Sequence, residues 1–195
     1  SNKINKLSKD QKSKGLVAYS SGNHAQAVGF ASLEEDISAK IIMPNNAPKI
    51  KIDNTRKYKA EVILYDPEKE IREDIAKEIA RNENRIIIKP YDDYDVIAGQ
   101  GTAAYEIAQD LDNFSIIPDI YLCCCGGGGL IAGTSTYLKY KYPNIKSFAV
   151  EPYGFDDTKK SLYSKRIVAN KSGYSSICDA IITPQPGELT FPINL

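Results

Sequence analysis

The sequence predicts an α/β protein that is built around a parallel sheet. Short apolar runs of strand length alternate with helical stretches along most of the chain. Glycine, proline or small polar residues follow several of these runs. A run of four glycines after residue 125 also separates an apolar run from an amphipathic helix. Together these features favour parallel strands with helices on both faces of the sheet.

The first half of the chain contains four predicted strands and the helices that connect them. The strands are expected at residues 16–19, 39–43, 61–64 and 85–88, and the helices at about 20–33, 47–59 and 67–82. Residues 1–14 are polar and place Ile4 and Leu7 on one helical face. We therefore expect them to form the end of a helix.

The second half begins with an acidic loop at residues 92–95. A helix with Gly99-Gln100-Gly101-Thr102 within or beside it follows and continues to Leu111. Next come a strand at 120–125, the glycine run, a helix that Pro143 ends, and a strand at 147–150. The regular pattern fades after Tyr153, and residues 179–195 are expected to be loop.

The composition excludes several classes of function. The chain has 195 residues, 25 basic and 25 acidic side chains, and a formal net charge of zero. This balance argues against a nucleic-acid-binding surface. We expect no membrane-spanning segment and no signal peptide, because no apolar stretch approaches the necessary length. We therefore expect a cytoplasmic protein.

Three of the four cysteines are adjacent. Cys123, Cys124 and Cys125 lie on one predicted strand, and Cys178 is distant in the sequence. Alternate side chains of a strand point to opposite faces, so three neighbours cannot converge on a single metal ion. We interpret them as small buried residues of a reducing compartment, with metal binding or redox chemistry as the alternative.

The glycine run predicts an anion site. Gly126, Gly127, Gly128 and Gly129 stand between a strand and a helix. Glycines let backbone N–H groups converge on an anion, and the helix N-terminus adds the positive end of its dipole. The alternative is an ordinary tight turn, for which four consecutive glycines would weaken the junction without a structural gain.

A second polar turn, residues 20–26, follows the first predicted strand. It places hydroxyl, amide and imidazole side chains at a helix start, where exposed N–H groups can hold a carboxylate. The alternative is a helix cap, for which Ser and Asn are favoured, although one cap needs only one such residue. His24 is the only histidine of the chain, and taken alone it favours a structural, hydrogen-bonded role.

These segments resemble those of one enzyme family. They are Ser20-Ser21-Gly22-Asn23-His24-Ala25-Gln26, Ala98-Gly99-Gln100-Gly101-Thr102 and Gly126-Gly127-Gly128-Gly129-Leu130. In this order the chain resembles the serine/threonine dehydratases and serine racemases, whose cofactor is pyridoxal phosphate (the fold-type II group). The resemblance covers nearly the whole chain and implies a parallel-sheet small domain plus part of a larger α/β domain.

The resemblance also implies roles for individual residues. Asn23 would hydrogen-bond the phenolic oxygen of the pyridoxal ring. The phosphate would be held by Gly126, Gly127, Gly128, Gly129 and Leu130. Ser20, Asn23 and His24 would surround the carboxylate of an amino-acid substrate.

Two further roles concern proton transfer and a metal ion. Ser21 matches a position that is Ser in racemases, where it moves the second proton, and many biosynthetic threonine dehydratases have Ala there. The segment from Glu151 to Asp157 is similar to the family's divalent-cation loop. There Glu151, the carbonyl of Phe155 and Asp157 would be ligands, and such oxygen ligands suit Mg²⁺ or Ca²⁺.

One departure from the family pattern is important. The family's Phe-Lys-x-Arg-Gly-Ala segment, which supplies the lysine that attaches the cofactor, is absent from these 195 residues. The group that contacts the pyridine nitrogen normally lies beyond residue 195. We therefore expect the middle of an enzyme: residues 1–14 as a helix of the large domain, 15–91 as the small domain, and 92–195 as part of the large one.

The expected reaction is dehydration and deamination of L-serine or L-threonine to a 2-oxo acid and ammonia by the complete parent enzyme, which we expect to be a homodimer. Serine racemase activity, or an inactive fragment that serves binding or assembly, are the alternatives. A dinucleotide-binding unit with Glu151 as its acidic residue is a further rival. Its G-x-G-x-x-G pattern fails because Ile131 stands at the third glycine position. The sequence does not separate serine, threonine and hydroxyaspartate as substrates.

Overall fold

The chain divides into two units, Ser1–Pro90 and Tyr91–Leu195, in a computed structural model that describes residues 1–171 and 173–195. Each unit has its own sheet. Residues 1–14 cluster with the first unit, and their assignment to a larger domain stays a prediction.

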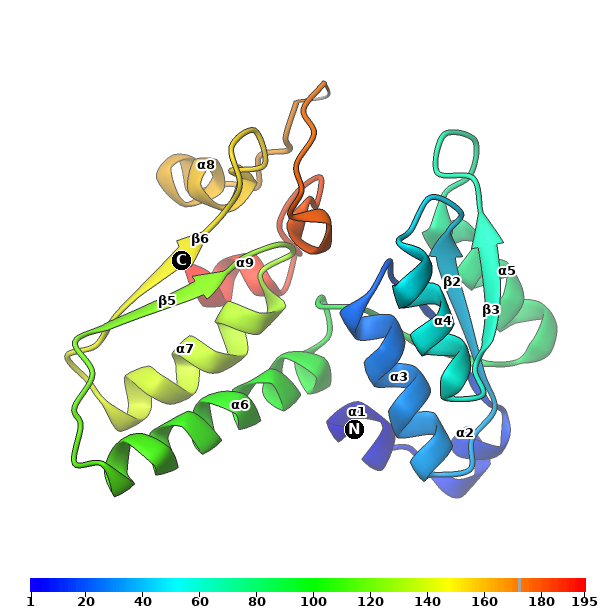
Figure 1. Ribbon diagram of the computed structural model, residues 1–195, viewed down its shortest axis with the longest axis horizontal. Coiled ribbons are helices and arrows are strands. Elements are labelled where there is room, and N and C mark those ends of the chain that lie inside the picture. The colour runs from blue at the N-terminus through cyan, green and yellow to red at the C-terminus, as the bar shows by residue number, and fades with distance from the viewer. Residues whose placement is uncertain (172) are drawn as a thin grey trace. The chain divides into compact units, whose positions relative to one another are not determined.

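The first unit is built on a parallel sheet of four strands (Figure 1). The strands are β1 (Leu16–Tyr19), β2 (Ala39–Pro44), β3 (Glu61–Tyr65) and β4 (Ile86–Ile88), in the order β3-β2-β1-β4. All three strand pairs are parallel, which confirms the predicted sheet. β1 is buried along its whole length, as expected for a strand covered on both faces.

Three helices cover this sheet. They are α3 (Asn23–Glu34), α4 (Lys49–Lys57) and α5 (Arg72–Glu83). In Figure 1, α3 and α4 lie on one face and α5 on the other. Ala76 of α5 packs against Val17, Tyr19 and Ile42 of the sheet, and this cluster forms one core layer of the unit.

Two helical predictions for this unit were wrong. Residues 1–14 form two short helices, α1 (Asn2–Asn5) and α2 (Lys9–Ser13), because Ser8 and Gln11 form a capping box that starts the second helix. The helix expected from residue 67 begins at Arg72. Asp66 explains the delay, since its carbonyl accepts hydrogen bonds from Lys69 N and Glu70 N in a turn.

The second unit pairs two parallel strands with two long helices. These are α6 (Tyr94–Asn113), β5 (Ile120–Cys124), α7 (Gly129–Lys141) and β6 (Lys146–Val150). α6 and α7 cross closely at Gly101 and Gly133. A Cβ on Gly133 would collide with the carbonyl oxygen of Ile97, and one on Gly101 would lie 3.1 Å from the carbonyl oxygen of Gly133. Gly101 of the 99–102 segment thus serves helix packing.

The rest of the second unit differs from the prediction. α6 begins at Tyr94 because Asp93 accepts hydrogen bonds from the N–H groups of Asp95 and Val96, so part of the expected acidic loop is helix. Residues after 153, expected to be irregular, contain α8 (Asp157–Ser164), a 3₁₀ turn (Asp179–Ile181) and α9 (Thr190–Asn194).

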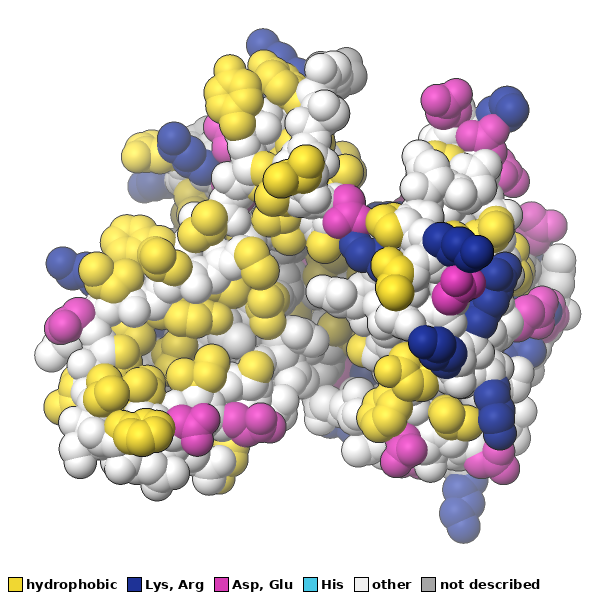
Figure 2. Space-filling view, in the orientation of Figure 1, with side chains coloured by type: hydrophobic (Ala, Val, Ile, Leu, Met, Phe, Trp, Pro, Cys, Tyr) yellow, Lys and Arg dark blue, Asp and Glu magenta, His cyan; other side chains and the backbone are white. Residues whose placement is uncertain are grey.

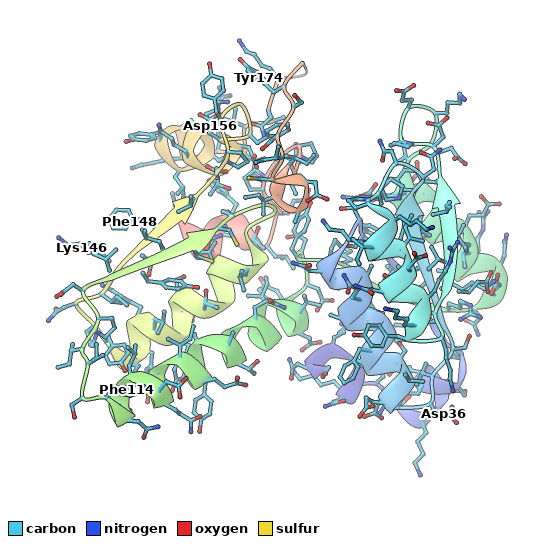
Figure 3. The ribbon with its side chains drawn as sticks, in the orientation of Figure 1. Asp36, Phe114, Lys146, Phe148, Asp156 and Tyr174 are labelled. Atoms are coloured by element: carbon cyan, nitrogen blue, oxygen red, sulfur yellow. The ribbon has the colours of Figure 1, made fainter. Side chains whose placement is uncertain are left out.

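Two apolar surfaces of this unit are exposed. One face of β5 and β6 presents Ile120, Leu122, Phe148 and Val150, and Figure 3 shows Phe148 on the outer side of β6. A groove of about 520 Å³ between α6 and α7 is lined by tyrosines, and Figure 2 shows apolar side chains over these helices. In the described part of the chain, every helix is too short or too polar to span a bilayer.

Candidate functional site

The polar turn at residues 20–26 lies at the switch point of the first sheet. From β1 the chain passes through α3 to β2 on one side, and it later returns to β4 on the other side of β1. The strand order therefore reverses between β1 and β4. In open α/β sheets, ligands bind beside the carboxyl ends of the strands at such a reversal. Ser20 and Ser21 leave β1 at this end.

The polar side chains of this turn do not cap the helix that follows. α3 begins at Asn23 after Gly22, and among the described side chains none caps its first turn. The Ser20 hydroxyl accepts a hydrogen bond from Gly22 N at 3.2 Å, which closes the turn before the helix starts. Asn23 is exposed, and Ser21 is partly buried. The first N–H groups of α3 therefore remain for a ligand, as the carboxylate hypothesis requires.

His24 ties the turn to the neighbouring strand. Its Nε2 lies 3.2 Å from the carbonyl oxygen of Ile88, the last residue of β4. Because a carbonyl only accepts, Nε2 carries the hydrogen and Nδ1 is the unprotonated nitrogen. Loss of solvation lowers the pKa of His24 to about 4, against the opposing effect of the Ile88 hydrogen bond. The imidazole is therefore neutral at pH 7 and offers no positive charge to a carboxylate.

The glycine run forms the junction between β5 and α7. Gly128 has φ +87° and precedes the first residue of the helix. A Cβ on Gly127 would overlap the ring of Tyr91, and one on Gly129 would lie 2.8 Å from the Cβ of Tyr91. The close approach of Tyr91 thus gives these glycines a packing reason that the sequence did not reveal.

The same junction leaves backbone donors open. Within the described residues, the N–H groups of residues 126–130 donate to no other group of the chain. They stand at the N-terminus of a 13-residue helix, where the dipole favours negative charge. Leu130 is 36% exposed, whereas Gly127, Gly128 and Gly129 are buried. This arrangement can bind a phosphate through backbone N–H groups.

Glu151 follows β6, and its carboxylate already accepts hydrogen bonds from the backbone. Its two carboxylate oxygens accept hydrogen bonds from Thr158 N at 2.8 Å and Lys159 N at 2.9 Å, which caps α8. In the sequence these residues are seven and eight positions away. Glu151 therefore stabilises the start of α8 in this structure.

Asp157 is buried and only partly satisfied. Its side chain is 1% exposed, and its Oδ1 accepts a hydrogen bond from Asn170 Nδ2. Its Oδ2 has no hydrogen-bond partner among the described residues. Burial raises the pKa of Asp157 to about 6, with a further rise from the nearby Glu151 charge. A cation could take Oδ2, but Glu151 would first have to release α8.

A cation site therefore fits these residues only in part. The predicted third ligand is the carbonyl of Phe155, a residue in a turn closed by its own N–H and the carbonyl of Pro152. Over residues 1–171 and 173–195, His, Cys, Asp and Glu form no group of three or more that could hold a metal ion.

The cysteine pattern follows the alternation of the strand. Cys123 and Cys125 are buried, whereas Cys124 and Cys178 are exposed, and none of these four forms a disulfide. Burial raises the pKa of the Cys125 thiol to about 12. Cys123 and Cys125 are thus inert small core residues, as expected, while the burial predicted for Cys124 was wrong.

The structure places the predicted site residues in two groups. Ser20, Ser21, Asn23 and His24 lie together in the first unit, and the glycine run, Leu130 and the Glu151–Asp157 segment lie in the second. Sequence reasoning missed the residues that contact the glycine run, among them Tyr91, Thr190 and Asn194.

The chain is similar to known enzymes over almost its entire length. The family model "Pyridoxal-phosphate dependent enzyme" matches residues 1–194. The serine racemase of Schizosaccharomyces pombe is 38% identical over 192 residues, which are 98% of this chain and 58% of that protein. The catabolic L-threonine dehydratase of Escherichia coli is 40% identical over 195 residues, 98% of this chain and 57% of that protein. This chain therefore spans a little over half the length of these relatives.

Solved structures agree on the fold. The processed form of threonine deaminase isoform 2 from Solanum lycopersicum superposes with a TM-score of 0.88 at 36% identity, over 98% of this chain and 55% of that one. With the parallel sheets and the family match, this similarity confirms the predicted architecture. The chain belongs to the pyridoxal-phosphate dependent enzyme family and has the fold-type II α/β fold.

Proposed function

We propose that this chain is the part of a pyridoxal-phosphate enzyme that binds the cofactor phosphate and the amino-acid substrate. The proposed reaction of the whole protein is dehydration and deamination of L-serine or L-threonine to a 2-oxo acid and ammonia. The observation that carries the proposal is the glycine junction, where the N–H groups of residues 126–130 are open at the start of α7.

The residues present fit a phosphate monoester. At the glycine junction a Cβ on Gly127, Gly128 or Gly129 would collide with Tyr91, Thr190 or Asn194, so no side chain fits at these positions and only backbone lines the junction there. Gly126, Gly127, Gly128, Gly129 and Leu130 would donate their N–H groups to the phosphate oxygens. The exposed amide of Asn23 would hydrogen-bond the phenolic oxygen of the ring.

The cofactor, when bound, acts as an electron sink that makes the Cα proton of an amino acid acidic enough to leave near neutral pH. The residues of the first turn hold the substrate. The hydroxyl of Ser20, the Asn23 amide and the open N–H groups of α3 would donate to its carboxylate. His24 would lie beside the carboxylate at the helix start without supplying a charge, because its neutral ring is hydrogen-bonded to the carbonyl of Ile88.

Serine racemisation is the second candidate, and Ser21 is the observation that favours it. A hydroxyl at this position can accept or return a proton on one face of the substrate, which dehydration does not require. The similarity to a serine racemase supports the same candidate.

Whether this chain alone is active is a separate question. Because the lysine-bearing segment of the family is absent from these 195 residues, we propose that this chain alone binds the cofactor without turning over substrate.

Four further assignments remain part of the proposal. Residues 15–91 would be the small domain, and 1–14 with 92–195 would belong to the large one. The complete protein would be a cytoplasmic homodimer. Mg²⁺ or Ca²⁺ would bind Asp157, the carbonyl of Phe155 and Glu151 after Glu151 leaves its cap on α8. The unpartnered Oδ2 of Asp157 supports this last assignment.

The experiment compares pyridoxal phosphate with pyridoxal as ligands of the purified chain. The phosphate group should strengthen binding by about 100-fold, because several charge-assisted hydrogen bonds each contribute about 1.5–3 kcal/mol before the phosphate is desolvated. Inorganic phosphate should compete. Equal affinity for the two ligands would refute the proposed phosphate cradle.

A further inference from the structure

The C-terminal segment of the second unit donates hydrogen bonds to backbone carbonyl groups of the glycine junction. The hydroxyl of Thr190 donates to the carbonyl of Gly127 at 2.6 Å, and Gly187 N donates to the same oxygen at 3.2 Å. The side-chain amide of Asn194 donates to the carbonyl of Gly128 at 3.2 Å. Two successive peptide groups of the junction are thus held from the same short segment.

The Thr190 contact is buried, and the segment is itself anchored. Thr190 is 0% exposed. The N–H of Leu189 donates to the Asp92 carboxylate at 2.7 Å, and Phe191 N donates to the carbonyl of Gly187 at 3.0 Å. Asp92 stands just before α6, so the segment is fixed to the same helix layer that supports α7.

Because the peptide group is planar, a contact that fixes a carbonyl also fixes the direction of the N–H group of the next residue. In a trans peptide the C=O of one residue and the N–H of the next point in opposite directions. A donor on the carbonyl of Gly127 therefore sets the direction of Gly128 N–H, and a donor on the carbonyl of Gly128 sets that of Gly129 N–H. These are two of the N–H groups that the proposed function assigns to the phosphate.

Glycine makes this control necessary. Glycine has the widest choice of backbone conformations, so a run of four would otherwise sample many orientations of its N–H groups. An anion would then have to order the run as it binds, and affinity would fall. A preset junction avoids that cost.

We propose that Thr190 and Asn194 are positioning residues for a phosphate monoester bound at the glycine junction. They do not contact the ligand. Together with Gly187 N and Ala132 N, which donate to the same two oxygens, they hold the carbonyls of Gly127 and Gly128 so that the opposite N–H groups face the anion. This inference rests on the proposed function, because it assumes that the junction binds phosphate.

The test measures the dissociation constants of pyridoxal phosphate and pyridoxal for the whole chain and its variants. Thr190→Val keeps the shape of the side chain and removes the hydroxyl, while Thr190→Ser keeps the hydroxyl. The matched control is Thr55→Val in the first unit. Thr55 is also 0% exposed and donates its hydroxyl to a backbone carbonyl, that of Lys51, at 2.8 Å.

Thr190→Val should weaken binding of pyridoxal phosphate about tenfold, the usual effect of one hydrogen bond, and leave pyridoxal binding unchanged. Thr190→Ser and Thr55→Val should bind both ligands as the wild type does. Asn194→Leu should weaken binding of pyridoxal phosphate about threefold, because the Asn194 bond is longer and Ala132 N still donates to the Gly128 carbonyl. If Thr190→Val fails to fold, Asn194→Leu provides the test instead, because Asn194 is partly exposed and its replacement disturbs the core less.

The outcomes separate the two proposals. A wild-type chain that binds both ligands equally would overturn the proposed function, and this inference with it. A wild type that prefers pyridoxal phosphate, with the same preference in a folded Thr190→Val or in Asn194→Leu, would overturn this inference alone. Loss of both ligands together in these variants would also overturn it, because it would indicate a general structural role.

Discussion

The neutral, tethered imidazole of His24 predicts that the first unit loses stability in mild acid. The pKa of His24 is about 4 in the folded chain and 6.5 when unfolded, so the unfolded state binds the proton more readily. Stability from this group is fully present above pH 6.5 and is lost as the pH falls through the folded value. At 1.36 kcal/mol per pKa unit, the free energy of unfolding falls by about 3 kcal/mol in all. About 2 kcal/mol of this is lost between pH 7.5 and 5.

The assay must separate His24 from a second group that titrates in the opposite sense. The raised pKa of Asp157, about 6, means that the folded second unit takes up a proton over the same range and gains stability. Urea unfolding is therefore followed through the amide resonances of β1 and β4, which report on the first unit, in the wild type and in His24→Gln. The variant should lack the acid-induced loss of about 2 kcal/mol.

The direct check is the NMR titration of the imidazole itself. His24 is the only histidine of the chain, so its Cε1–H resonance is assigned without ambiguity. We expect a midpoint near pH 4 and, at pH 7, the tautomer protonated at Nε2. A midpoint near 6.5, or an equal loss of stability in wild type and variant, would refute this reasoning.

Three other predictions follow from the second unit and the first turn. Gly127→Ala should lower the free energy of unfolding by about 1–3 kcal/mol, because the added Cβ overlaps the Tyr91 ring. Adding Tyr91→Ala should recover part of that loss. Strictly additive effects of the two substitutions on the free energy of unfolding would contradict the contact. Mg²⁺ or Ca²⁺ should raise the melting temperature of the wild type but not of Asp157→Asn, and an equal response in both would place the cation elsewhere. In the full-length protein, Ser21→Ala should abolish conversion of L- to D-serine, measured by chiral analysis, while dehydration persists. If both activities fall together, Ser21 holds the geometry of the turn and moves no proton.

The strands and most of their helices could be predicted because their signals are local. Apolar runs such as residues 39–43 need only their own composition and a proline at the end to mark a buried strand. Parallel pairing followed from the helices between them. The polar turn and the glycine run were found for the same reason, since each is a contiguous segment at the carboxyl end of a strand.

Some boundaries were missed because of local caps, such as the Ser8–Gln11 capping box, but other contacts join residues farther apart in the sequence. α8 begins where it does because Glu151 caps it from seven positions away, a contact that no local pattern encodes. The bond from His24 to Ile88 joins residues 64 positions apart, and that from Thr190 to Gly127 joins residues 63 apart. The sequence therefore located the backbone of the candidate site but not the side chains that hold it in place.

The most direct test of the central claim is an amide NMR titration of the ¹⁵N-labelled chain with pyridoxal phosphate. The largest chemical-shift changes should occur at the N–H groups of residues 126–130, and inorganic phosphate should produce the same subset of changes at higher concentration. If those resonances stay in place while others move, the glycine junction is not the phosphate site.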